Sequence, residues 1–178
     1  RGTEIILNNI GSKPATYRVS LQLKRMNADG SLEEVVLTEA SEIQTKTLAM
    51  VSYAPRKVTL APNQPQSIRI GFRPAPGLPD GEYRVHLLFR AIPEARPVSA
   101  EANVTSGFAI ALNPIYGVSI PVIVRKGKLT ATAGMTNPVL ETVGGKTDLV
   151  LKLSRTGNRS TYGRLRVMKA GQSEPVYE

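Results

Sequence analysis

Apolar and polar residues alternate strictly along three stretches of this chain, which cover residues 16–24, 67–73 and 83–89. The apolar positions, each two residues from the next, are Tyr17, Val19, Leu21 and Leu23; Ile68, Ile70 and Phe72; and Tyr83, Val85, Leu87 and Phe89. Because side chains alternate between the two faces of a strand, this period predicts half-buried β-strands. A helical period is weak throughout the chain.

Turn-forming residues separate these stretches at intervals that suit a β-sandwich. They lie at 8–11, 27–30, 62–65 and 74–81, with β-branched runs between them. The stretch from Glu39 to Met50 has no firm apolar stripe, and we interpret it as a long connection or an edge region. The pattern therefore predicts an all-β fold of many short antiparallel strands.

Length and composition allow one large β domain or two smaller ones. The chain has 178 residues, of which 41% are hydrophobic, so a packed core is expected. It has no cysteine, which excludes a disulfide and a thiolate zinc site. No apolar run approaches the roughly 20 residues that span a bilayer, so we expect no membrane insertion.

The formal net charge of +9 is compatible with nucleic acid, an anionic membrane or an acidic protein as a partner. The basic residues are dispersed, mostly at alternate strand positions, and form no polybasic run. Only 5% of residues are aromatic, and no strand motif for base stacking is present. Nucleic-acid binding is therefore disfavoured.

Residues that would support catalysis are scarce. His86 is the sole histidine, and its place in the alternation predicts a solvated or interface position on the outer face of a strand. Gly144, Gly145, Lys146 and Thr147 lack the earlier glycine of a phosphate-binding loop and predict a hairpin turn. Asn158-Arg159-Ser160 fits a glycosylation pattern to which we give no weight. We expect no enzyme, no metal, no cofactor and no small-molecule substrate.

The stretch from Phe108 to Val124 is the most informative. Phe108, Ile110 and Leu112 alternate, and the apolar pattern resumes from Ile115 to Val124. Pro114 and Pro121 interrupt it, and proline is confined to sheet edges, bulges and strand starts. The stretch is either a docking edge for another strand or a core strand with two bulges.

A junction is expected near residues 125–128, where the apolar run ends. Beyond it, Leu149, Leu151 and Leu153 predict one strand, and Leu165 and Val167 another. About 50 residues is short for a complete sandwich, so this second β unit is either small or incomplete. Upstream, the Asp80–Val85 segment predicts either a tyrosine corner centred on Tyr83 or an ordinary turn before a strand.

Four motifs resemble the PapD-like periplasmic chaperones of the chaperone/usher pathway, which assemble pili and other fimbriae. Residues 4–19 are similar to the first complete hairpin of the family. Residues 55–70, with Pro55-Arg56-Lys57-Val58, look like its central signature, and residues 78–93 like the F strand that ends in Ile-Pro. Residues 116–125 resemble the end of its G strand.

The resemblance implies two immunoglobulin-like β-sandwich domains. The N-terminal chaperone domain would cover residues 1–126, with the first strand of the family missing, and a partial C-terminal β domain would cover 127–178. A G strand donated to the partner would use Phe108, Ile110 and Leu112, with Val118 and Ile120 as a second set. Glu82 and Arg125 would form an interdomain ion pair. The family's G-strand lysine is absent, and Ser119 or Pro121 stands near its place.

The function implied by this resemblance is that of a periplasmic assembly chaperone. It would capture a pilus or fimbrial subunit by donor-strand complementation and release it to an outer-membrane usher. The alternative is a structural or adhesive immunoglobulin-like module of a surface assembly. Polymerisation distinguishes them, because a fibre subunit polymerises or needs an incoming strand, whereas a chaperone remains monomeric.

Overall fold

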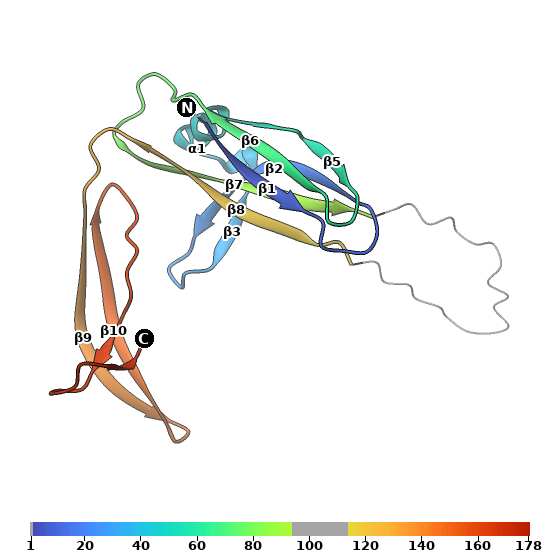
Figure 1. The fold of residues 1–178 in the computed structure, drawn as a ribbon. Helices are drawn as coiled ribbons and strands as arrows, with labels where there is room; N and C mark the ends of the chain where they lie inside the picture. The colour runs from blue at the N-terminus through green and yellow to red at the C-terminus, as the bar shows by residue number, and fades with distance from the viewer. Residues whose placement is uncertain (1, 94–113) are drawn as a thin grey trace, which may run out of the picture. The chain divides into compact units, whose positions relative to one another are not determined.

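A computed structural model of the chain describes residues 2–93 and 114–178 (Figure 1). By their contacts these fall into two compact units, one made of residues up to 78 with 83–124, and the other of 79–82 with 125–178. The predicted boundary at 126/127 lies close to this division, although residues 79–82 group with the second unit.

In residues 2–93 and 114–126, the strands of the first unit number eight, and two short helices lie among them. They are β1 (Gly2–Asn8), β2 (Ala15–Met26), β3 (Leu32–Val35), the 3₁₀ helix η1 (Leu37–Glu39), α1 (Glu42–Ala49), β4 (Val51–Ala54), β5 (Lys57–Leu60), β6 (Pro65–Phe72), β7 (Gly81–Ile92) and β8 (Gly117–Lys126). One sheet has the order β1-β6-β4 and the other β3-β2-β7-β8, with β5 also paired to β2. The predicted all-β fold is confirmed.

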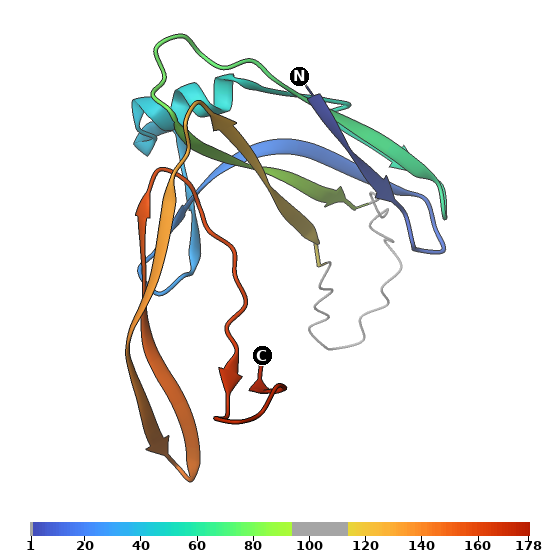
Figure 2. The same ribbon diagram turned by 60° about the vertical axis from the view of Figure 1, so that its left-hand side comes forward.

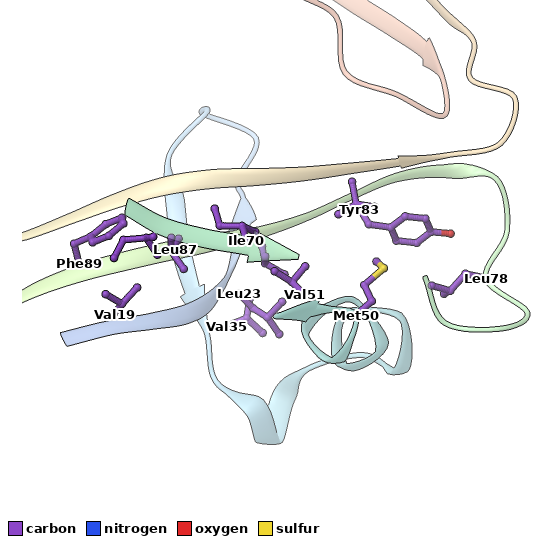
Figure 3. Close-up of a cluster of buried hydrophobic side chains, with 13 residues drawn as sticks. Val19, Leu23, Val35, Met50, Val51, Ile70, Leu78, Tyr83, Leu87 and Phe89 are labelled. Atoms are coloured by element: carbon purple, nitrogen blue, oxygen red, sulfur yellow. The ribbon is translucent and has the colours of Figure 1, made fainter. Parts of the chain in front are cut away.

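The core contains side chains from both sheets (Figure 3). Tyr83, Val85, Leu87 and Phe89 are all buried, as the alternation predicts, and so are Ile68 and Ile70 on β6. On β2, Val19 and Leu23 are buried and Leu21 packs against them. Burial of this apolar surface removes it from water, which is the main favourable contribution to folding.

The first two strands correct one expectation. Residues 4–19 do not form a hairpin, because β1 pairs with β6 and β2 pairs with β3, β5 and β7. The chain passes between the sheets at Asn9, which is 3% exposed. Its side-chain amide donates to the carbonyl oxygens of Lys13 (2.8 Å) and Leu60 (3.1 Å), and its Oδ1 accepts from the Gly11 N–H. These bonds satisfy the buried amide and fix the crossover.

A second expectation is corrected at residues 39–50. This stretch was expected to be a long connection or an edge region, but most of it is helical. Ser41 is the N-cap of α1, and its hydroxyl accepts from the Gln44 N–H (3.3 Å) while the Gln44 side chain accepts from the Ser41 N–H (2.9 Å). This reciprocal pair is a capping box. A local capping signal, rather than an apolar stripe, therefore marks the helix.

The second unit contains β9 (Ala131–Val143), β10 (Lys146–Gly157), β11 (Val167–Met168) and β12 (Pro175–Tyr177). β9 and β10 form a long hairpin, and β11 pairs with β12. The predicted turn at Gly144-Gly145 is confirmed, with φ angles of 60° and 80°. Two consecutive positive φ angles suit glycine and a tight hairpin turn. Leu149 and Leu153 lie on β10 but are exposed, and Leu165 lies outside the strands.

Candidate functional site

Strand β8 lies at the border of its sheet. It follows β7 in the strand order, and within residues 2–93 and 114–178 no strand lies on its other side. Figures 1 and 2 show it running beside β7. A border strand has amide and carbonyl groups that can pair with an added strand.

The apolar side chains of β8 become less buried toward its N-terminal end. Val124 is 5% exposed, Val122 and Ile120 are partly buried against the core, and Val118 is 61% exposed. Of the two predicted partner-strand residues on this strand, Ile120 is therefore used by the chain's own core and Val118 is accessible. Tyr116 and Ile115, just before the strand, are also exposed.

A backbone hydrogen bond indicates which groups of β8 face outward. The Ala91 N–H donates to the Tyr116 carbonyl oxygen (2.9 Å), so the backbone carbonyl of Tyr116 points toward β7. In an antiparallel strand, the backbone groups of alternate residues bond to the same neighbour. We therefore infer that the backbone N–H and C=O groups of residues 118 and 120 also point toward β7, and that those of 119, 121 and 123 point toward the open side. Pro121 then costs no bond of the ladder with β7.

The other predicted partner-strand residues, Phe108, Ile110 and Leu112, lie outside the described residues. Their assignment stays a prediction.

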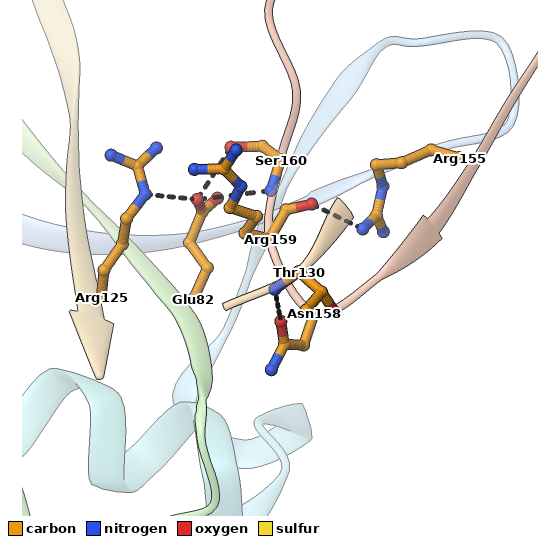
Figure 4. Close-up of polar contacts among 7 residues, drawn as sticks. All are labelled: Glu82, Arg125, Thr130, Arg155, Asn158, Arg159 and Ser160. Carbon is orange, nitrogen blue, oxygen red and sulfur yellow. Dashed lines mark hydrogen bonds and ion pairs between the residues drawn. The ribbon is translucent and has the colours of Figure 1, made fainter. Parts of the chain in front are cut away.

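Glu82 and Arg125 are in contact, in a group of polar residues within the second unit (Figure 4). Arg125 Nε donates to Glu82 Oε2 (3.1 Å), and the same oxygen accepts from the hydroxyl of Ser160 (2.8 Å) and its N–H (3.3 Å). The Glu82 side chain is only 8% exposed, whereas that of Arg125 is 45% exposed. The donors offset the loss of water around the carboxylate. That the pair fixes an interdomain angle stays a prediction.

Asn158 extends this group and was not found from the sequence. Its Oδ1 accepts from the Thr130 N–H (2.9 Å), and its side-chain amide donates to the carbonyl oxygens of Lys128 (3.0 Å) and Asp80 (3.2 Å). Asp80 also accepts from the Lys128 N–H (2.9 Å). Asn158 thus joins three segments that are far apart in sequence, and no local motif signals that role.

His86 is buried, which corrects the expected solvated or interface position. It is 3% exposed, and it lies directly opposite Gln22 of β2. Burial, together with the positive charges of Lys24 and Arg84, lowers the pKa of His86 below its ordinary value of 6.5. The neutral imidazole is therefore favoured. Its Nδ1 has no protein hydrogen-bond partner among the described residues.

The part of the chain that the structure describes contains no group of three or more His, Cys, Asp or Glu side chains able to hold a metal. In the same residues, no helix has the length and apolar character needed to cross a membrane.

Comparison with known proteins gives matches in structure. No protein-family model matches the sequence, and no curated protein matches it. A chaperone–tip adhesin complex of CFA/I fimbriae biogenesis is similar, with 14% identity and a TM-score of 0.48 over 89% of this chain. The match spans 61% of the length of that chain.

Two further solved structures are similar. The crystal structure of the Pseudomonas aeruginosa CupB2 chaperone has 15% identity and a TM-score of 0.46, over 91% of this chain and 81% of that one. The ASH / PapD-like domain of human CEP192 has 13% identity and a TM-score of 0.39, over 72% of this chain and 74% of that one. All three TM-scores are below 0.5.

Proposed function

We propose that this protein is a periplasmic assembly chaperone that captures a pilus or fimbrial subunit by strand donation and passes it to an outer-membrane usher. The donated segment comprises β8 and the residues before it, with Phe108, Ile110, Leu112 and Val118 as the side chains offered to the subunit. The protein binds and releases its partner and performs no covalent chemistry. The resemblance of its motifs to PapD-like chaperones supports this role.

The single observation that carries the proposal is the position of β8 at a sheet border with Val118 61% exposed. Proteins normally protect such edges, because an apolar edge strand promotes aggregation. Pairing with a subunit strand gives the outward amides of β8 hydrogen-bond partners and covers Val118. Ile120 contributes indirectly, by anchoring the strand to the core.

The proposal is tested by removing one outward amide. Ser119→Pro deletes the N–H of a residue inferred to face the open side, and Pro121 shows that the strand already accommodates proline two residues later. Ser119→Ala is the matched control, because it keeps the amide and removes only the hydroxyl. Each variant is co-expressed in the periplasm with a pilin that lacks its complementing strand, and the complex is isolated through a tag on the chaperone.

We expect Ser119→Ala to retain the pilin and Ser119→Pro to lose it, with both variants folded by circular dichroism. Equal retention by the two variants would refute pairing at β8. Polymerisation of the purified chain by itself would instead favour the structural or adhesive module.

A further inference from the structure

Three basic residues form a row across neighbouring strands of the five-stranded sheet. Arg18 of β2 lies directly opposite Lys57 of β5 on one side and directly opposite Arg90 of β7 on the other. Directly opposite residues of paired strands point to the same face of a sheet. Strands lie about 4.8 Å apart, so the Cα atoms of the three residues span about 10 Å across the sheet. We call these three residues the basic row.

The rest of β2 shows the opposite arrangement. Lys24 lies opposite Glu34 of β3, and Arg25 lies opposite Glu33, with 2.9 Å between Arg25 Nε and Glu33 Oε1. The same strand therefore matches its cations with acids at one end and with further cations at the other.

The basic row has no acidic partner among the described residues, and all three of its members are exposed. Like charges directly opposite each other destabilise a sheet. Water and salt reduce the repulsion between these cations, and an anionic partner would offset it further, because each cation attracts the anion. The row therefore attracts negatively charged groups.

We propose that the basic row is a docking face for an acidic segment of another protein. Guanidinium groups bind carboxylates through paired N–H donors, and two of the three residues are arginines. The positions next to the row hold Thr16 and Thr59, joined by a 2.8 Å hydroxyl contact, and on the other side Ser20 and Leu88. None is an aromatic on which a nucleic-acid base could stack, which favours a protein partner. This docking does not depend on strand pairing at β8.

The test uses a fluorescently labelled oligo-glutamate peptide as the probe, with binding followed by anisotropy at low and moderate salt. The variant Arg18→Gln/Lys57→Gln/Arg90→Gln removes the row. The control Lys13→Gln/Arg69→Gln/Arg73→Gln removes the same charge from exposed cations elsewhere in the first unit. A urea melt of both variants checks folding, and we expect the row variant to be at least as stable as the parent because its like-charge pairs are gone.

We expect the row variant to bind the peptide about tenfold more weakly than the parent, and the control to stay within about twofold. Equal weakening in the two variants, or no binding by the parent at low salt, would overturn the proposal. Tighter binding of an oligothymidylate of equal charge, or of phosphatidylglycerol vesicles, would overturn the assignment to a protein partner.

Discussion

Gln22 and His86 face each other across β2 and β7, and both carry a buried polar atom without a protein hydrogen-bond partner. These atoms are Gln22 Oε1 and His86 Nδ1, and Ser119 Oγ of β8 is likewise buried without a protein hydrogen-bond partner among the described residues. Unsatisfied buried polar groups cost stability, and a charge added to one of them costs more. Protonation of His86 is therefore unfavourable in the folded state.

Folding should weaken in mild acid because of His86. Its pKa in the folded state is lowered by burial and by Lys24 and Arg84, so the unfolded chain binds the proton more readily. Stability is fully present above the unfolded pKa of about 6.5 and is lost progressively as the pH falls below that value and through the lower folded-state pKa. Urea melts of the parent at about pH 7.5 and 5.5 should show a lower midpoint at the acidic value.

His86→Gln provides the control, because it keeps a polar side chain and cannot titrate in this range. Its midpoint should change less between the two pH values than that of the parent. The same loss of stability in both proteins would mean that another group causes it.

Glu82→Gln should loosen the polar group around Ser160. The change removes the charge that Arg125 and Ser160 contact, and because Arg125 is half exposed the expected cost is about 1–2 kcal/mol. Hydrogen exchange at the amides of Ser160 and Thr130 measures it locally and should become faster. Glu141→Gln, an exposed position on β9, should leave those amides unchanged. Unchanged exchange in both variants would show that the carboxylate does not hold this segment.

The strands were predictable because burial of one face imposes a period of two on the sequence, as along Tyr83 to Phe89. The same alternation correctly predicts that His86 points away from the core formed by Tyr83, Val85 and Leu87. It does not reveal that His86 is nevertheless buried on that other face. The pairing of β1 with β6 was also missed, because the pattern along a strand does not specify its neighbour. Ser160 contacts Glu82 at the start of β7, and Asn158 contacts Asp80 just before that strand, each across 78 residues of sequence, so no local motif could reveal these contacts.

The helix α1 was missed because its apolar residues form no stripe, so its stability should depend on its cap. Ser41→Ala removes the hydroxyl that accepts from the Gln44 N–H, and caps of this type contribute about 1 kcal/mol. A urea melt should show that loss. Ser52→Ala, which removes an exposed hydroxyl bonded to the Gly71 carbonyl, is the control and should cost less. Equal costs would imply that packing, rather than the capping box, maintains the helix.

Gly127 is the glycine whose replacement should most disturb the loop that contacts Asp80. Its φ of 71° is strained for other residues, and a Cβ added there would overlap the Asp80 carboxylate. That carboxylate accepts from the Lys128 N–H and lies 3.6 Å from Lys126 Nζ, so Gly127→Ala displaces a group that is already in use. Gly30→Ala is the matched control, because Gly30 has a φ of 85° but open space around it. It should cost only the backbone strain, about 1 kcal/mol, whereas Gly127→Ala should cost clearly more. Equal midpoint shifts in urea melts would mean that Asp80 moves aside freely and does not fix this loop.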